Sequence, residues 1–445
     1  MKQRFFELAD YAIGQLHGTE TLLANFAGET SDFARFNHAR IRQAGSVTQA
    51  YLRLTLIDRG RRLHTTLAAS FDQPSDHDAI RAAIGTMRSE LPSLPADPLL
   101  LYATEVNSSN LERRGRLPDA TEAVDCVIAA AAGADLVGIF ASGPVFRGFA
   151  NSLGQRNWHR VDSFQLDWSV YLGGDQDAKD KAVKSTYASE TWNAQEVARR
   201  IQSARDQLKF LAVNPRAIEP GQYRAYLTPA AMDELTGLLS WEGVSGRSQR
   251  TRQSSLQKLV DGEAALSPMI TLRENTTEGL APSFDDSGFP RPPQVALIKD
   301  GAHAGALVSA RTAKEYDLVA NGACDEESMQ SADLDGGTLP MSETLGTLDR
   351  GILVANLWYL NFSDRSSCRI TGMTRFATFW VESGRIAAPL NVMRFDDSLY
   401  RMLGSELLAL TREREWIQSR STYGQRSVES TRVPGALLSR LTLTL

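Results

Sequence analysis

Apolar residues recur at helical spacing in several stretches of the first half of the chain. The first of these stretches has an apolar face that consists of Phe5, Phe6, Leu8, Ala9, Ala12, Ile13 and Leu16. A stripe of this kind is typical of an amphipathic helix that covers a sheet or another helix. Ser75 and Asp119 are expected as N-caps of two later helices. The pattern predicts helices over residues 3–16, 75–91, 119–133 and 194–211.

Between these helices the pattern changes to the alternation of strands. Leu52, Leu54 and Leu56 share one face, and Gly60 follows, so residues 47–70 are expected to form a hairpin. Residues 92–118 are rich in proline and polar side chains and are expected to form a loop. Further strands are predicted over 21–27, 135–143, 145–152 and 163–172. This order of elements predicts an α+β domain.

Two prolines and a glycine in residues 214–222 indicate a domain boundary. The N-terminal α+β domain is therefore expected over 1–213 and a second domain over 222–445. Strands dominate the second part, and Asp300-Gly301 and Ser383-Gly384 stand where hairpins would turn. The second domain is predicted to be a mostly antiparallel β-sheet or open barrel with few helices.

Composition and charge exclude several functional classes. The chain has 445 residues, of which 42% are hydrophobic, and a net charge of −5. This balance does not favour a nucleic acid or an anionic membrane as partner. The densest basic run, residues 247–253, lacks interleaved aromatic residues and is interpreted as a solvated loop. No stretch approaches the ~18 uninterrupted apolar residues of a membrane span.

The cysteines and the N-terminus indicate a compartment. The three cysteines are far apart and odd in number, which does not fit a disulfide framework. The first 16 residues carry charges along a predicted helix and do not resemble a signal peptide. The expected location is the cytoplasm.

Candidate chemistry is sparse. No two of the six histidines lie within five residues of each other, and none is followed by glutamate, so no zinc motif is present. Cys368 has no histidine neighbour that would argue for a catalytic thiol. Asp285 and Asp286 stand in "SFDDSGFP", whose residue types favour a turn. The sequence therefore predicts no catalytic residue and no metal ligand in this chain.

Several segments together resemble the TldD/PmbA family. They are "SDFARFNHARIRQAG" (31–45), "VFRGFANSLG" (145–154), the "FDD-G-P" turn with the hairpin that follows it (282–316), and the hairpin of 374–404. The resemblance implies one subunit of a two-subunit cytoplasmic peptidase. A TldD-like subunit carries zinc on an H-E-x-x-x-H helix, with a cysteine ligand near the C-terminus. A TldE-like (PmbA) subunit lacks these ligands and pairs with the first to degrade or trim unfolded peptides, including modified peptide antibiotics.

The stretch "AYLTPAAMDELTGLLSWEGVSGRSQR" (225–250) corresponds to the zinc helix in this resemblance. Thr228 and Pro229 are suited to the N-cap and the first helical position, and Asp233 and Glu234 are expected in the first turn. The helix carries no histidine, and the C-terminal segment carries no cysteine. The family's zinc ligands therefore do not carry over, and zinc is expected in a TldD-like partner.

Three functional hypotheses follow. The first is a non-catalytic TldE-like subunit that completes a peptide-binding chamber and accepts extended peptides by strand addition. Arg375, Asn391 and Arg394 are its candidate chamber residues, with ordinary sheet-edge or loop roles as the alternative. The second is a homodimeric binding or regulatory protein of the gyrase-modulator type. The third is an enzyme with a relocated site, which bound metal in the purified protein would indicate.

Overall fold

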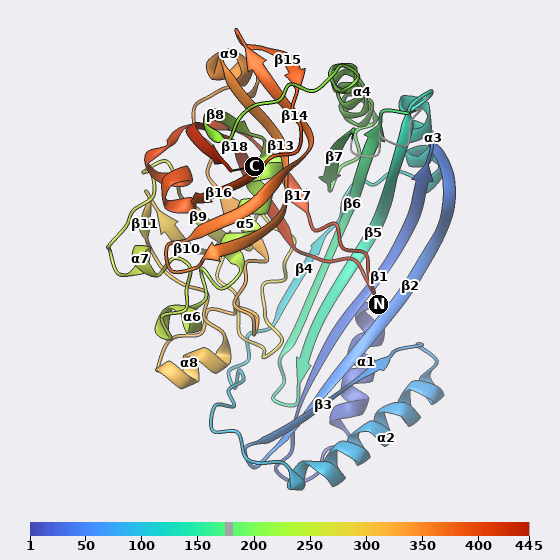
Figure 1. Ribbon diagram of the computed structural model, residues 1–445. Coiled ribbons are helices and arrows are strands. Elements are labelled where there is room, and N and C mark those ends of the chain that lie inside the picture. The colour runs from blue at the N-terminus through green and yellow to red at the C-terminus, as the bar shows by residue number, and fades with distance from the viewer. Residues whose placement is uncertain (174–180, 445) are drawn as a thin grey trace.

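Two β-sheets with helices packed against them form the protein (Figure 1). The computed structural model describes residues 1–173 and 181–444. Most strand pairs in both sheets are antiparallel, and parallel pairing is limited to β4 with β6, β12 with β18 and β8 with β13. This arrangement confirms the α+β class. Along the described residues, no helix combines the length and apolarity needed to cross a membrane.

The N-terminal sheet has seven strands in the order β3-β2-β1-β5-β6-β4, with β7 paired to β6. Four of its strands are unusually long and form the diagonal band of Figure 1. The elements are α1 (Lys2–Ile13), β1 (Thr21–Asn37), β2 (Arg40–Asp58), β3 (Arg61–Ala68), α2 (Gln73–Glu90), β4 (Ser109–Arg113), α3 (Ala120–Ala130), β5 (Asp135–Asn151), β6 (Arg156–Tyr171), β7 (Ala182–Ser189) and α4 (Ala194–Leu211).

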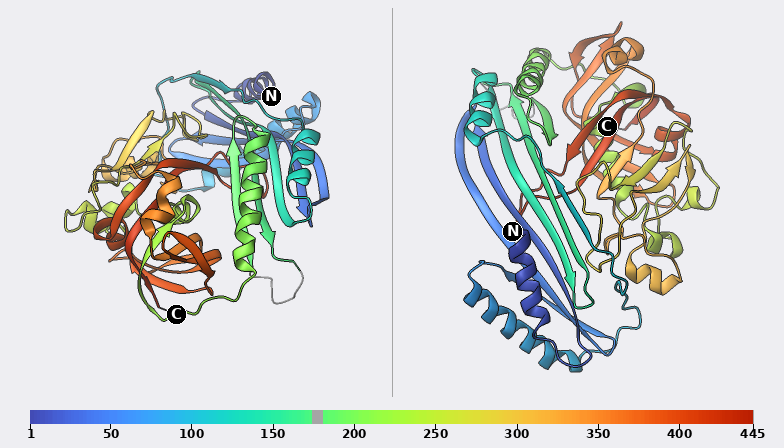
Figure 2. Two further views of the ribbon diagram at one scale, coloured as in Figure 1. Left: turned by 90° about the horizontal axis from the view of Figure 1, so that it is seen from above. Right: turned by 180° about the vertical axis from the view of Figure 1, so that it is seen from behind.

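The two faces of this sheet have different partners because side chains alternate along each strand. Phe26 and Leu54 lie on the face that α1 and α2 cover, in one core with Phe5. Leu23 and Phe149 lie on the opposite face and contact Phe284 of the C-terminal body. Figure 2 shows α1 and α2 at one end of the long strands and the C-terminal body along their other side.

Strand β2 extends well beyond its neighbour β3. Residues Tyr51–Asp58 of β2 pair with β3, whereas residues 40–50 pair only with β1 within the described chain. The side chains of residues 40–48 are exposed. This end of β2 is therefore a free sheet edge with both faces in water.

The C-terminal sheet has eleven strands. Pairing runs from β18 through β16, β14, β13 and β8 and returns to β18, so five strands close a ring. The elements are β8 (Gly221–Leu227), α5 (Pro229–Ser240), α6 (Gly246–Arg250), α7 (Gln257–Val260), β9 (Leu272–Asn275), β10 (Gln294–Lys299), β11 (Ala302–His303), α8 (Ala310–Tyr316), β12 (Ser331–Leu334), α9 (Thr344–Leu348), β13 (Gly351–Asp364), β14 (Arg369–Glu382), β15 (Arg385–Pro389), β16 (Arg394–Ser398), β17 (Leu407–Gln418) and β18 (Ser430–Leu443).

The two sheets are not independent, because they share a hydrophobic core. Val197 and Ile201 of α4 belong to one buried cluster with Phe379, Val381 and Leu437 of the C-terminal body. The chain passes from α4 to β8 through the segment in which the domain boundary is predicted. The limits 1–213 and 222–445 stay a prediction.

Several predicted elements are confirmed. Helix α4 has the predicted limits, and the β2–β3, β10–β11 and β14–β15 pairs form the expected hairpins. Asp119 caps α3 by accepting a hydrogen bond from the backbone N–H of Thr121 at 2.9 Å. Asp300 and Ser383 have positive φ at the two predicted hairpin turns. Local turn and capping chemistry was sufficient to predict these features.

Other predictions were wrong. Strand β1 continues to Asn37, ten residues past its predicted end, and β5 is one strand where two were expected. The predicted loop 92–118 contains β4, and β7 was not anticipated. Helix α2 begins earlier than predicted, because the Asp72 carboxylate accepts from the Ser75 N–H at 3.3 Å and so acts as the N-cap.

A segment between β17 and β18, residues 419–429, fastens the C-terminal body to the N-terminal sheet. Its Arg426 side chain is fully buried. The guanidinium donates to the backbone oxygens of Gly143 and Ser163, both at 2.8 Å, and to Ser163 Oγ at 2.9 Å. Gly143 has φ 141°, and a Cβ there would lie 2.1 Å from the Thr30 carbonyl oxygen. Only glycine allows this close approach.

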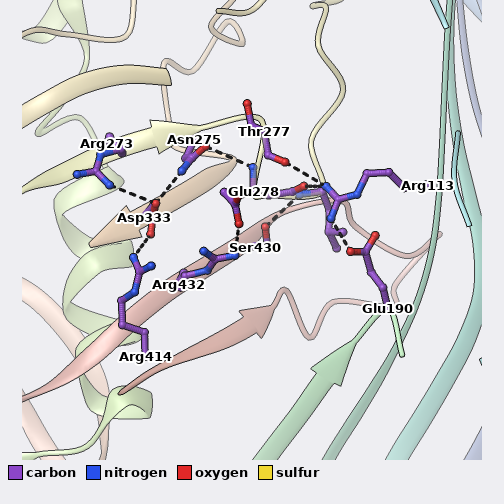
Figure 3. Close-up of polar contacts among 12 residues, drawn as sticks. Arg113, Glu190, Arg273, Asn275, Thr277, Glu278, Asp333, Arg414, Ser430 and Arg432 are labelled. Carbon is purple, nitrogen blue, oxygen red and sulfur yellow. Dashed lines mark hydrogen bonds and ion pairs between the residues drawn. The ribbon is translucent and has the colours of Figure 1, made fainter. Parts of the chain in front are cut away.

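A second polar contact between the sheets is drawn in Figure 3. Arg113 of β4 donates to the Gly279 carbonyl and to Glu190, both at 2.5 Å. Nearby, the buried Asp333 carboxylate accepts from Asn275 at 2.7 Å and pairs with Arg414 at 2.5 Å. The Arg113–Gly279 bond joins the two sheets, whereas the Asp333 contacts join β9, β12 and β17 within the C-terminal sheet.

We predict that Arg426→Met lowers the free energy of unfolding by about 3–5 kcal/mol, because removing one partner leaves buried carbonyls without donors. Urea unfolding followed by fluorescence measures the change. The matched control is Arg42→Met on the exposed end of β2, which is expected to change stability by less than ~0.5 kcal/mol. Equal effects of the two substitutions would contradict the structural role of Arg426.

Candidate functional site

Helix α5 is well formed although it lacks zinc ligands. Thr228 is its N-cap and accepts from the Ala231 N–H at 3.4 Å, and Pro229 is its first residue, as predicted. Met232 and Leu235 are buried in the C-terminal core. Asp233 and Glu234 were expected in the first turn, but the first turn holds no acidic residue. They lie one turn further along, so the helix dipole does not explain them.

A cleft of about 510 Å³ lies beside α5. One wall is α5 itself, and the others come from residues 328–332, from the end of β17 with the segment that follows it, and from the start of β18. The volume is within the ~300–1,000 Å³ of typical ligand sites. The lining side chains that carry charge are Asp233, Glu234, Arg420 and Glu429.

Arg420 neutralises the acidic side of this cleft. Its Nη2 lies 2.9 Å from Glu234 Oε1. Burial alone would lower the pKa of Arg420, but the Asp167 and Glu234 carboxylates outweigh burial and raise it. Asp167 is on β6, where Lys184 of β7 pairs with it at 3.8 Å. The N-terminal sheet therefore contributes an acid and a base to the surroundings of α5.

Asp233 is the most perturbed acid of the cleft. Burial raises its pKa to about 6, although Arg420 and a hydrogen bond from Thr431 act in the opposite direction. The adjacent Glu234 carboxylate adds to the increase. Asp233 is therefore a carboxyl group that changes protonation state near neutral pH. Perturbation of this kind is enriched in functional sites but also occurs in structural networks.

The residues around α5 do not fit a zinc ion. Catalytic zinc sites use three protein ligands, most often imidazoles, with an open fourth position. The cleft is lined by three carboxylates and no imidazole, and one of the carboxylates, Glu234, pairs with Arg420. Within residues 1–173 and 181–444, no three His, Cys, Asp or Glu side chains converge to hold a metal. We therefore derive no zinc chemistry in this chain.

The histidines and cysteines have other surroundings. His159 is buried, its Nε2 lies 2.9 Å from the Leu280 carbonyl oxygen, and burial lowers its pKa to about 4. His38 is exposed and pairs with Asp135 at 2.8 Å. Burial raises the pKa of Cys368 to about 12, which disfavours a reactive thiolate. Asp285 accepts from two backbone N–H groups, so the predicted turn at 283–290 is confirmed.

The structure places Arg375, Asn391 and Arg394 away from the α5 cleft. Arg375 of β14 stacks over the exposed Trp358 ring, 4.7 Å from its centroid. Arg394 begins β16 and donates to Thr371 Oγ1 at 3.1 Å. Since Arg394 pairs with Met373, it shares a sheet face with Arg375, two residues along β14.

Asn391 is exposed between β15 and β16. The structure therefore brings the two arginines onto one exposed face and leaves Asn391 in a connecting segment. Their role in peptide binding stays a prediction.

Comparison with known proteins shows the family. Residues 220–445, half of the chain, match the family model of the PmbA/TldA metallopeptidase C-terminal domain. The chain belongs to the PmbA/TldD family. The match begins at β8 and includes α5, the cleft beside it and the 419–429 segment. No curated protein sequence matches the chain.

Solved structures of PmbA/TldD-like proteins have the same fold. A proposed modulator of a DNA gyrase from Thermotoga maritima is 14% identical with a TM-score of 0.79, over 99% of this chain and 100% of that one. TldE from Thermococcus kodakarensis is 15% identical with a TM-score of 0.78, over 99% of this chain and 100% of that one. A proposed modulator of DNA gyrase from Bacteroides thetaiotaomicron is 15% identical with a TM-score of 0.76, over 100% of this chain and 98% of that one.

Sequence reasoning found α5 but not the groups that surround it. Arg420 lies 186 residues from Glu234 along the chain, and Thr431, Asp167 and Lys184 come from three different strands. None of these four residues forms a local motif. Only the tertiary fold brings them together, so no spacing rule could have predicted the contacts.

We predict that Asp233→Asn stabilises the protein at pH 8 but not at pH 4. The folded pKa of about 6 lies above the ordinary aspartate value, so the native state loses stability as the pH rises through this pKa, and that loss is complete at pH 8 and absent at pH 4. Because Asp233 keeps some contact with water, we expect a gain of about 1–2 kcal/mol at pH 8. Urea unfolding at both pH values measures it, and a gain that is equal at pH 4 would contradict the assignment.

Proposed function

We propose that the chain is a non-catalytic, TldE-like subunit of a cytoplasmic zinc metallopeptidase complex that degrades or trims peptides. The observation that carries this proposal is the chemistry of α5. The helix is intact, borders a cleft of about 510 Å³ and presents two carboxylates held by Arg420 and Thr431. A helix with these neighbours can shape a chamber, but the cleft offers no imidazole, and the Glu234 carboxylate pairs with Arg420.

The proposal assigns the zinc ion to a TldD-like partner, and this chain completes the chamber that binds the peptide. The family match spans the half of the chain that contains α5, and TldE from Thermococcus kodakarensis has the same fold. The exposed face with Arg375 and Arg394 is our candidate for contact with an extended peptide, to which Asn391 would add an amide. Aromatic and guanidinium groups of this kind are frequent at binding surfaces.

The second candidate is a homodimeric regulatory protein without peptidase activity. It is favoured by two similar structures, each of a proposed modulator of DNA gyrase. Affinity purification of the tagged chain from its own cells separates the two functions. We expect a near-stoichiometric second chain that contains H-E-x-x-x-H, identified by mass spectrometry. Recovery of this chain alone would favour the homodimer and contradict the proposed subunit role.

We predict that Glu234→Gln leaves peptide cleavage by the reconstituted pair within about twofold of wild type. The Glu234 carboxylate pairs with Arg420 and has no imidazole neighbour in the cleft. Removing a true general base costs ~100-fold or more. The matched control is the same substitution at the glutamate of the partner's H-E-x-x-x-H motif, which should abolish cleavage. A loss of that size from Glu234→Gln would overturn the non-catalytic assignment.

A further inference from the structure

A second cavity, of about 520 Å³, lies between the N-terminal sheet and the C-terminal body. Its floor is the sheet face of β1, β2, β3 and β5 that faces away from α1 and α2. Its roof is formed by the 282–287 turn, residues 323–326 and the end of the 419–429 segment. This cavity is distinct from the α5 cleft, and part of its lining comes from the N-terminal sheet, which lies outside the family match.

The wall that comes from the N-terminal sheet is cationic. Arg53 of β2, Arg62 and His64 of β3 and Arg147 of β5 line it, and no acidic side chain of that sheet does. Arg147 is partly buried and donates to the Phe146 carbonyl oxygen at 2.8 Å. Among the described residues, no carboxylate lies within ion-pair distance of Arg147. Arg62 is exposed, and Arg53 and Arg147 are partly buried, so three guanidinium groups gather on this wall and suit it to an anion.

The opposite wall is mostly acidic. Asp285, Asp286, Asp325, Glu326 and Glu429 line it, and Arg291 is its one base. Asp285 is buried and accepts from the Ser287 and Phe289 N–H groups at 2.9 and 2.8 Å. Those hydrogen bonds stabilise the turn of residues 283–290, from which Asp286 lines the cavity.

The opposed charges hardly meet across the cavity. Among the lining residues, the ion pair that crosses it joins Arg53 Nη1 to Asp286 Oδ2 at 3.9 Å, the long limit of such a contact. The Nε atoms of Arg53 and Arg291 are buried and have no hydrogen-bond partner. If the charges of the two walls only stabilised each other, we would expect ion pairs across the cavity. Instead, the basic and acidic side chains remain largely separated.

Apolar side chains occupy one side of the same space. Leu23, Ile57 and Phe284 line the cavity and form a small hydrophobic cluster with Phe149. Leu100 and Tyr102 pack against this cluster. A ligand that suits the cavity therefore carries a carboxylate, an ammonium group and a modest apolar portion between or beside them.

We propose that this cavity binds a short peptide through both of its free ends, with the C-terminal carboxylate at Arg53 and Arg147 and the N-terminal ammonium at Asp286 and Glu429. Glu429 also lines the α5 cleft, so the two spaces adjoin at the end of the 419–429 segment. Many zwitterions carry a carboxylate and an ammonium group. We choose a peptide because the inference rests on the proposed peptidase complex, whereas the assignment of the carboxylate to the arginines and of the ammonium group to the carboxylates holds for any zwitterion.

Calorimetric titration of the purified full chain with trialanine tests the proposal. We expect a Kd of about 1 mM or tighter. Trialanine amide is expected to bind at least tenfold more weakly, because it lacks the carboxylate. N-acetyl-trialanine should lose a similar factor, since it lacks the ammonium group. Free alanine, which cannot span the cavity, should bind more weakly than trialanine.

Variants assign each end of the peptide to a wall. Arg147→Met should weaken trialanine at least tenfold and abolish the difference between trialanine and its amide. Asp286→Asn should abolish the difference between trialanine and its N-acetyl form. Arg59→Met, on the exposed β2–β3 turn, is the matched control and should leave all affinities unchanged. If Arg147→Met does not fold, Arg53→Gln replaces it, because 42% of the Arg53 side chain is exposed.

Two results would overturn the inference: no binding of trialanine by the wild-type chain at this affinity, or equal affinities for trialanine and both capped forms. Alanine binding as tightly as trialanine would refute the choice of a peptide. The titration contains no partner subunit, so its failure is separable from that of the proposed function. Absence of binding with successful recovery of an H-E-x-x-x-H partner would remove the cavity site and leave the subunit role intact.

Discussion

One buried guanidinium holds the two halves of this protein in register. Arg426 passes from the C-terminal body into the N-terminal sheet and donates to carbonyl oxygens on β5 and β6. Both terminal nitrogens of this buried guanidinium donate hydrogen bonds, which restricts its position, whereas its Nε has no partner among the described residues. The α5 cleft and the charged cavity both lie beside the 419–429 segment that carries Arg426. Their shapes therefore depend on this attachment together with the hydrophobic core that α4 shares with the C-terminal body.

Helix α5 is held in place by its cap and its apolar face. The N-cap, the proline start and the leucine face all serve packing, and packing alone maintains the helix. The polar face of α5 carries the Asp233 and Glu234 carboxylates, and Arg420 supplies a positive charge beside them. A guanidinium balances charge without offering the open coordination position that hydrolysis needs. Among the charged side chains that line the cleft, Arg420 is the one base.

The sequence predicted local features well and long-range features poorly. Helix α4 and the hairpin turns follow from periodicity and turn residues, which act over a few positions. The extension of β1 to Asn37 was missed because residues 31–37 mix polar and apolar side chains without clean alternation. Arg420 and Arg426 lie in an irregular segment with no pattern of its own. Their roles arise only from contacts hundreds of residues away, which no local rule contains.

The free end of β2 has a consequence for how the protein behaves in concentrated solution. An unpaired edge exposes backbone donors and acceptors that can recruit a strand from another molecule and begin a fibre-like stack. Residues 40–48 carry Arg40, Arg42, Gln43 and Gly45 on this edge, with both faces in water. Like charges and a glycine disfavour such stacking between copies of the chain. The long curved sheet therefore carries its own protection against aggregation at its most vulnerable border.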